Sequence, residues 1–336
     1  MYIPNNNPLK NTHTHAMRAT IKLLIAFFVV LAITIALIVI CISLLKPSLC
    51  RAWDLHPTKH IYNKHGRGRH SLQAPSIPKI IWTYWNNDTI PPFIQNCIDS
   101  WRKHNPTFHV IVLTPSNLST YINMDLKGIS WNDGPARESD IVRLSILEKY
   151  GGVWSDASII LYKPYSFVGK MDGSFDFIGY YLEGFTTNKD YPIIESWFFA
   201  TPPHGEFISA WKHAFFHLGN NKENTLSIPK RLEQIKPSID FQKIDNPDYL
   251  FIHVAAQHVL QKQMTPADII KNMWLEKAED GPYQYLVRNK WNSKASVNYL
   301  KDRNRDKDIT SAKIRSCERG HISDSILNDL FMSVNA

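Results

Sequence analysis

The fold of this chain is decided by one stretch, ARESDIVRLSILEKYGG at residues 136–152 followed by VWSDASIIL at residues 153–161. The first part predicts a helix over residues 136–150, and the Gly151-Gly152 pair is a common signal that ends a helix. The second part is rich in β-branched and aromatic residues, which predicts a strand over residues 153–162.

Strands and helices alternate on the N-terminal side of this stretch as well. Residues 77–85, IPKIIWTYW, predict a buried strand. Apolar residues then recur at helical spacing over residues 92–105, and residues 108–114 predict a further strand. This alternation indicates an α/β sheet with its sites at the carboxyl ends of the strands. It resembles a nucleotide-binding unit, although the sequence lacks a Gly-rich phosphate loop.

Three charged residues near the deciding stretch are candidates for chemistry. Asp140 and Arg143 are three residues apart, so they project from one face of the predicted helix. Such a pair can bind a ribose hydroxyl and a phosphate together, and the alternative is a surface ion pair. Asp156 lies within the otherwise apolar predicted strand, where an unpartnered acid is costly to bury. We therefore expect Asp156 to face a cleft, a ligand or a cation.

The charge distribution argues against nucleic acid as a partner. The chain has 336 residues and a formal net charge of +8, but residues 1–80 hold ten Lys/Arg and the single acid Asp54. The remaining residues are close to neutral, so they lack the broad positive surface that binding to a phosphate backbone needs.

The N-terminal region predicts a membrane anchor. Residues 23–45 carry no charge and, as a helix, would reach about 34 Å, enough to cross a bilayer core of about 30 Å. A cleaved signal peptide is the alternative, but its apolar region would be shorter. We predict a cytoplasmic tail at residues 1–22, a transmembrane helix at 23–45, a stem at 46–76 and a globular domain at 77–336.

The predicted orientation is type II, with the C-terminal domain in the lumen of the Golgi or another secretory membrane. The sequons at Asn87 and Asn117 favour a glycoprotein with a lumenal domain. Cys50 follows the predicted span and could link two stems into a homodimer, whereas the alternative is an unpaired thiol.

The deciding stretch, together with the strand at residues 77–82, resembles the capsular polysaccharide synthesis protein group, which is related to glycosyltransferase family 32 and its Asp-x-Asp sugar-binding region. The resemblance covers roughly residues 77–260 and is most specific over 136–164. It implies a GT-A fold, a Rossmann-like mixed sheet flanked by helices that binds a nucleotide sugar, with retention at the anomeric carbon.

The resemblance also implies roles for individual residues. It places Trp82 near the base, Asp140 and Arg143 on the nucleotide, and Asp156 at the first acid of the Asp-x-Asp motif. Ser158 stands where many relatives have the second acid, which ligates Mn²⁺ or Mg²⁺, and a hydroxyl is a poor substitute for a carboxylate.

Two further residues belong to the predicted site. Glu195, with Asp156, is a candidate catalytic residue because its segment resembles the one that closes over the donor sugar. His253 is a candidate ligand of a phosphate or of the metal, alongside Asp156 and Ser158, and the alternative is a hydrogen-bonded histidine in an apolar setting. The basic run at residues 288–319 could cover the diphosphate, and the alternative is a solvated surface.

The sequence therefore predicts a hexosyl- or N-acetylhexosaminyl-transferase that moves a sugar from a nucleotide donor to a glycan or glycolipid hydroxyl. The missing second acid leaves open an inactive pseudo-transferase or glycan-binding protein. A glycoside hydrolase would need two carboxylates at a defined separation, and the spacing of Asp156 and Glu195 does not support one.

Overall fold

The computed structural model describes residues 27–31, 33–34, 75–219, 227–302, 305 and 307–335. The chain divides into two units, residues 1–51 and 52–336. In the first unit the described residues are helical. Among the described residues we find no helix with the length and apolar character needed to cross a bilayer.

Most of the predicted N-terminal features fall outside the described residues. Only seven residues of the predicted span at 23–45, and two of the predicted stem at 46–76, are described. Cys50 lies outside the described residues too. Cys97 is free and buried, so no disulfide joins two described cysteines. The tail, span, stem and disulfide-linked dimer stay predictions.

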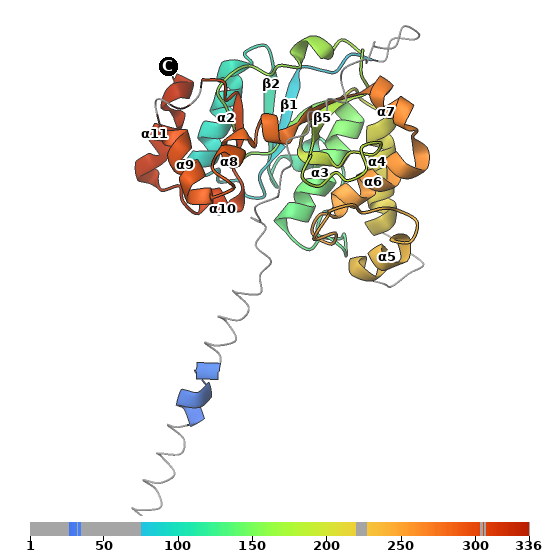
Figure 1. Ribbon diagram of the computed structural model, residues 1–336, viewed down its shortest axis with the longest axis horizontal. Coiled ribbons are helices and arrows are strands. Elements are labelled where there is room, and N and C mark those ends of the chain that lie inside the picture. Colours follow the sequence, from blue (N-terminus) through green and yellow to red (C-terminus); the bar gives the residue numbers. More distant parts are fainter. Residues whose placement is uncertain are drawn as a thin grey trace, which may run out of the picture. The chain divides into compact units, whose positions relative to one another are not determined.

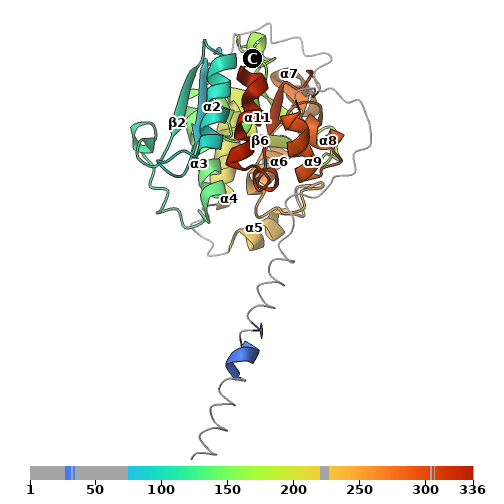
Figure 2. The ribbon, with the colours of Figure 1, turned by 90° about the vertical axis from the view of Figure 1, so that its left-hand side faces the viewer.

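A six-stranded mixed sheet forms the centre of the second unit, as the α/β prediction requires (Figure 1). The strand order across the sheet is β2 (His109–Leu113), β1 (Ile80–Tyr84), β3 (Gly152–Ser155), β6 (Ile194–Thr201), β5 (Phe177–Tyr181) and β7 (Met273–Lys277). Strand β6 pairs antiparallel with both of its neighbours, and every other pairing is parallel. The carboxyl ends of the other five strands therefore lie along one edge of the sheet. Figure 2 shows β2 at the outer side.

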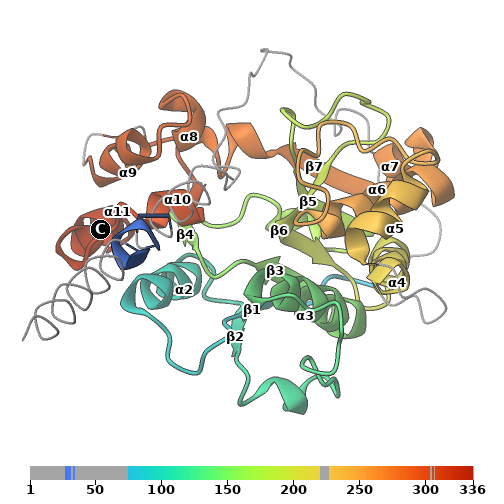
Figure 3. The same cartoon turned by 90° about the horizontal axis from the view of Figure 1, so that it is seen from below.

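Helices cover both faces of this sheet. Helix α2 (Pro92–His104) connects β1 to β2, and α3 (Pro135–Tyr150) connects β2 to β3 on the other side of β1. Because such crossovers are right-handed, the two helices cover opposite faces, and Figure 3 shows them on either side of β1. Helix α3 packs on α4 (Glu206–Gly219), which packs on α6 (Phe251–Gln263). The other helices are α5 (Ile228–Ile235), α7 (Pro266–Asn272), α8 (Gln284–Arg288), α9 (Ser293–Lys301), α10 (Ser316–Arg319) and α11 (Asp324–Asn335).

The predicted strand over residues 153–162 is wrong as a single element, because the chain turns at Asp156. Strand β3 ends at Ser155, and β4 (Ile159–Leu161) belongs to a separate two-stranded sheet with β8 (Ser311–Lys313). The amide of Asp156 donates to the Trp197 carbonyl at 2.8 Å, and the Ile159 amide donates back to the Asp156 carbonyl at 3.1 Å. Asp156 therefore lies in the turn that follows a central strand.

The Gly151-Gly152 pair ends α3 as predicted. The amide of Gly151 donates to the Leu147 carbonyl at 2.9 Å, and the two glycines have φ values of 63° and 101°, which L-residues rarely adopt. A Cβ on Gly152 would lie 2.7 Å from the carbonyl oxygen of Ile80 in the neighbouring strand. Glycine is thus required for the tight passage from α3 into β3.

The two predicted sequons differ in structure. Asn87 is exposed, whereas the side-chain amide of Asn117 donates to the Val112 carbonyl at 2.9 Å. Asn117 is half-buried and already bonded to the backbone, so Asn87 is the more accessible acceptor.

Candidate functional site

The candidate site lies along the sheet edge where the five parallel strands end. Asp156 follows the carboxyl end of β3, and Glu195 lies at the start of the antiparallel β6, so both are at this edge. Asp140 and Arg143 come from α3, and Lys313 comes from β8. Residues from four separate segments of the chain thus meet beside the β3 turn.

Asp156 forms the centre of the site. Its Oδ2 accepts a hydrogen bond from Lys313 Nζ at 2.6 Å, and its Oδ1 accepts from Trp154 Nε1 at 2.9 Å and Arg143 Nη2 at 3.2 Å. Burial raises the pKa of Asp156, but Lys313 and Arg143 outweigh burial and hold this pKa below its ordinary value. The side chain, 22% exposed, is therefore an ionised carboxylate that solvent can reach.

Arg143 is a buried organiser of the site, with a side chain only 6% exposed. Its Nη1 donates to the carbonyl and the hydroxyl of Ser196, both at 2.8 Å, and lies 3.3 Å from Asp140 Oδ1. Its Nη2 donates to Ser139 Oγ at 3.0 Å as well as to Asp156. Burial excludes the alternative that Asp140 and Arg143 form a surface ion pair. The terminal nitrogens of Arg143, however, already donate hydrogen bonds within the protein.

Asp140 is buried beside Arg143. Burial raises the pKa of Asp140 to about 6, while Arg143 and Arg137 act in the opposite direction. Arg137 is itself buried, donates to the Asp248 carbonyl at 2.6 Å and lies over the Phe251 ring. The predicted pairing of Asp140 with Arg143 is thus present in the structure, in the interior of the protein.

The residues predicted to bind a metal do not form a suitable ligand set. Lys313 Nζ lies 2.6 Å from Asp156 Oδ2 and 3.2 Å from Ser158 Oγ, so an ammonium group already contacts two of the three expected ligands. His253 Nε2 lies 3.1 Å from Glu195 Oε2 in a separate buried pair. No group of three or more His, Cys, Asp or Glu side chains in the described part of the chain could hold a metal ion. The donor chemistry therefore does not fit Mn²⁺ or Mg²⁺.

Glu195 and His253 lie next to this centre and form a pair of their own. Both side chains are almost fully buried, at 5% and 6% exposed. Ser196, the next residue along β6, accepts the hydrogen bonds from Arg143. A shift of β6 would therefore affect both Glu195 and Arg143.

Trp82 lies in the core rather than on an open surface. Its side chain is stacked on Tyr150, packs edge-on against Tyr121 and donates to the Gly151 carbonyl at 2.9 Å. The residue is only 2% exposed, so a nucleotide base could reach its ring only if these tyrosines moved.

Sequence reasoning missed Lys313 and Tyr249 as members of the site. Lys313 was part of the basic run at residues 288–319, but nothing in that run distinguishes it from its neighbours. Tyr249 precedes α6 and is 45% exposed. Burial raises the pKa of its hydroxyl, and the charges of Asp140 and Asp156 raise it further, so Tyr249 is within electrostatic reach of both carboxylates.

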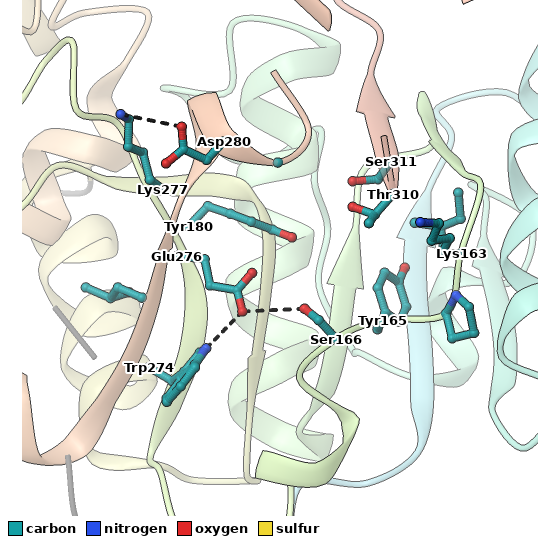
Figure 4. A pocket seen from close by; sticks show the side chains of 14 residues that line it. Lys163, Tyr165, Ser166, Tyr180, Trp274, Glu276, Lys277, Asp280, Thr310 and Ser311 are labelled. Atoms are coloured by element: carbon teal, nitrogen blue, oxygen red, sulfur yellow. Dashed lines mark hydrogen bonds and ion pairs between the residues drawn. The ribbon is translucent and has the colours of Figure 1, made fainter. Parts of the chain in front are cut away.

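A cavity of about 500 Å³ is lined by residues of β5 and β7, by residues 161 and 163–166, and by Thr310 and Ser311. Figure 4 shows Tyr165, Tyr180 and Trp274 around it, with the Glu276 carboxylate held by Ser166 and Trp274. None of the predicted site residues lines this cavity. The Trp197 ring stacks on Tyr180 at 5.3 Å, and the Trp197 carbonyl accepts the amide of Asp156. One aromatic residue thus connects the cavity wall to the Asp156 turn.

Sequence comparisons with known proteins support a relation to glycosyltransferases. A family model described as "Capsular polysaccharide synthesis protein" matches residues 60–228, half of the chain. The O-glycosyltransferase braB of Annulohypoxylon truncatum is 21% identical over 301 residues, which cover 76% of this chain and 70% of braB. The glycosyltransferase afumC of Aspergillus fumigatus is 32% identical over 98 residues, a quarter of each protein. A solved structure, the PaToxG glycosyltransferase, is 16% identical with a TM-score of 0.31, covering 58% of this chain and 83% of that one.

Proposed function

This chain belongs to the capsular polysaccharide synthesis protein family, and on that premise we propose that it transfers a hexose or N-acetylhexosamine from a nucleotide sugar to a glycan or glycolipid hydroxyl, with retention. The observation that carries the proposal is the turn after β3, where the ionised Asp156 is reached by solvent between Arg143 and Lys313. A nucleotide sugar presents hydroxyl groups to a carboxylate and phosphate oxygens to a cation, and this turn offers both partners.

The arrangement of the sheet supports a GT-A type of fold. Five strands end at one edge, where a nucleotide is expected to bind in an α/β sheet. We further propose that the domain is lumenal and anchored by residues 23–45, as the sequence predicts.

The proposed reaction breaks the bond between the anomeric carbon and the diphosphate oxygen. The electron pair of that bond stays on the diphosphate, the acceptor oxygen bonds to the anomeric carbon, and the proton of the acceptor hydroxyl passes to the leaving diphosphate. Asp156 would orient the donor, with Arg143 and Asp140 holding Asp156 in place from behind. Glu195 would lie next to the donor sugar, in a position fixed by His253.

The cavity lined by β5 and β7 is our proposed acceptor site. It combines the Tyr180 and Trp274 rings with the Glu276 carboxylate, and Tyr180 stacks on Trp197, whose carbonyl accepts the Asp156 amide. Aromatic faces pack against sugar rings, and a carboxylate accepts hydrogen bonds from their hydroxyls.

A turnover assay with one matched pair of variants tests the proposed function. The full chain is incubated with a panel of nucleotide sugars, and hydrolysis or transfer is measured for wild type, Asp156→Asn and Asp99→Asn. Asp156→Asn keeps the shape of the side chain and removes its charge, so we expect turnover to fall at least ~100-fold. Asp99 is an exposed acid on α2, paired with Arg102, and its variant should keep wild-type turnover.

The same assay separates the enzyme from an inactive binding protein. Donor binding without any turnover would favour a pseudo-transferase or glycan-binding protein, the reading that Ser158 leaves open. Full activity of Asp156→Asn would contradict the proposed role of this turn.

A further inference from the structure

We propose that the ammonium group of Lys313 is a built-in cation of this site, which excludes a divalent metal from Asp156 and Ser158 and compensates the charge of the leaving diphosphate. This inference rests on the proposed transferase function.

The position of the ammonium carries the first step of the argument. Lys313 Nζ bridges Asp156 Oδ2 at 2.6 Å and Ser158 Oγ at 3.2 Å. These are the two side chains that an Asp-x-Asp motif would direct at a metal. A divalent cation on the same oxygens would lie within a few ångströms of the ammonium and be strongly repelled by it. The lysine and a metal therefore compete for one place.

The backbone around Lys313 holds the side chain in this place. Lys313 lies opposite Ile159 in the β4–β8 pairing, and the amide of Ile314 donates to the Ser158 carbonyl at 3.0 Å. The Lys313 carbonyl accepts from the Tyr285 hydroxyl at 2.7 Å, and its amide donates to the Pro282 carbonyl at 3.0 Å. Four backbone constraints thus fix the lysine relative to the Asp156–Ser158 turn before any ligand binds.

The ammonium retains the capacity to contact a ligand. It has three N–H donors, and two of them are directed at Asp156 and Ser158. Within the described ranges the third has no acceptor. Arg143, by contrast, already donates to four oxygens of the protein through Nη1 and Nη2, and its Nε, which has no partner among the described residues, is buried away from any ligand. Of these two cations, Lys313 is the one that can donate to a diphosphate oxygen as negative charge develops there.

Metal binding gives a test that does not depend on turnover. Binding of Mn²⁺ to the full chain is measured by electron paramagnetic resonance for four forms: wild type, Ser158→Asp, Lys313→Gln, and the double variant Ser158→Asp/Lys313→Gln. We expect no Mn²⁺ site in the wild type or in Ser158→Asp, because the ammonium is still present. The double variant has two carboxylates and no ammonium, so it should bind Mn²⁺ at least ~10-fold more tightly than the wild type.

Nucleotide binding gives the second arm of the test. Calorimetry with UDP and GDP in excess EDTA should show binding to the wild type and an affinity at least ~10-fold lower for Lys313→Gln, as expected for the loss of a charge-assisted hydrogen bond. Lys294→Gln is the matched control, because Lys294 is an exposed cation of the same basic run and should leave the affinity unchanged.

Each outcome decides between the two proposals. The lysine inference is overturned if wild-type protein binds one Mn²⁺ that Asp156→Asn abolishes, or if EDTA abolishes nucleotide binding. It is also overturned if Lys313→Gln, folded by circular dichroism, binds nucleotide like the wild type. If neither nucleotide binds any form, with or without Mn²⁺, the transferase proposal itself fails, while the Mn²⁺ titration still reports whether Lys313 excludes the ion. The effect of EDTA on nucleotide binding is measured on the wild type alone. The lysine inference can therefore be refuted even if the double variant misfolds.

Discussion

Replacing Arg143 by alanine should lower the stability of the protein. This prediction distinguishes two roles for Arg143: a buried residue that organises the site, and a surface residue that contacts phosphate. The guanidinium lies 3.3 Å from Asp140 and 3.2 Å from Asp156, with a side chain 6% exposed. Removing one partner of a buried charge pair typically costs about 3–5 kcal/mol, because the remaining charge stays buried without compensation. We expect Arg143→Ala to lower the free energy of unfolding by an amount in that range.

The chain offers a matched control in Arg102. Arg102 also pairs with an acid three residues away, Asp99 at 2.7 Å, but the two side chains are 47% and 53% exposed. Exposed pairs of this kind contribute about 0–1 kcal/mol, so Arg102→Ala should be close to the wild type. Both variants remove an arginine from an i,i+3 ion pair on a helix. The difference between their free energies of unfolding therefore reports the effect of burial.

Urea unfolding followed by tryptophan fluorescence measures both effects. A lower midpoint with an unchanged slope would report a loss of stability. Arg143→Lys should recover part of the loss, because it keeps the charge but cannot reach Ser139, Ser196 and both carboxylates together. If Arg143→Ala is within about 1 kcal/mol of the wild type and still loses nucleotide binding, Arg143 is a ligand contact and the burial argument fails.

Two further predictions concern pH and the acceptor. Burial raises the pKa of Asp140 to about 6. Between the ordinary pKa of about 3.8 and pH 6, the native state therefore keeps a proton that the unfolded chain has released. This difference makes the free energy of unfolding fall as the pH rises through that range. Asp140→Asn should reduce the fall, and urea midpoints that decline as steeply as in the wild type over this range would contradict it. Glu276→Gln can still accept the hydrogen bonds from Trp274 and Ser166 but loses its charge, so the acceptor KM should rise about 10-fold with the rate of donor hydrolysis unchanged. A changed donor KM with an unchanged acceptor KM would remove the acceptor from this cavity.

Local sequence signals were sufficient for much of the N-terminal half of the domain. Helix α3 and its end at Gly151-Gly152 follow from the local sequence, and β1, α2 and β2 lie within a few residues of their predicted ranges. The break at Asp156 could not be predicted in this way. Strands β3 and β4 are both apolar, and they separate only because β4 pairs with β8, about 150 residues further along the chain.

The burial and contacts of each site residue were harder to predict than its membership of the site. The i,i+3 spacing brought Asp140 and Arg143 together correctly, but it could not show that the pair is buried, with Arg143 bonded to Ser196 of β6. An aromatic residue at position 82 suits either a nucleotide base or a buried core, and only the tyrosines around Trp82 decide between them. Lys313 contacts Asp156 across 157 positions of sequence, a separation that carries no local pattern.

The serine at position 158 and the lysine at position 313 are best understood as two parts of one arrangement. Asp156 already has two cations within 3.2 Å, Lys313 and Arg143, so its single charge is fully compensated. A second carboxylate at position 158 would add a negative charge beside that balanced group, whereas the Ser158 hydroxyl accepts from the ammonium and adds none. A metal would require that second carboxylate and the departure of the lysine at the same time. A single substitution therefore cannot convert this site into a two-acid metal site, which is why the double variant, and not Ser158→Asp alone, should acquire Mn²⁺ affinity.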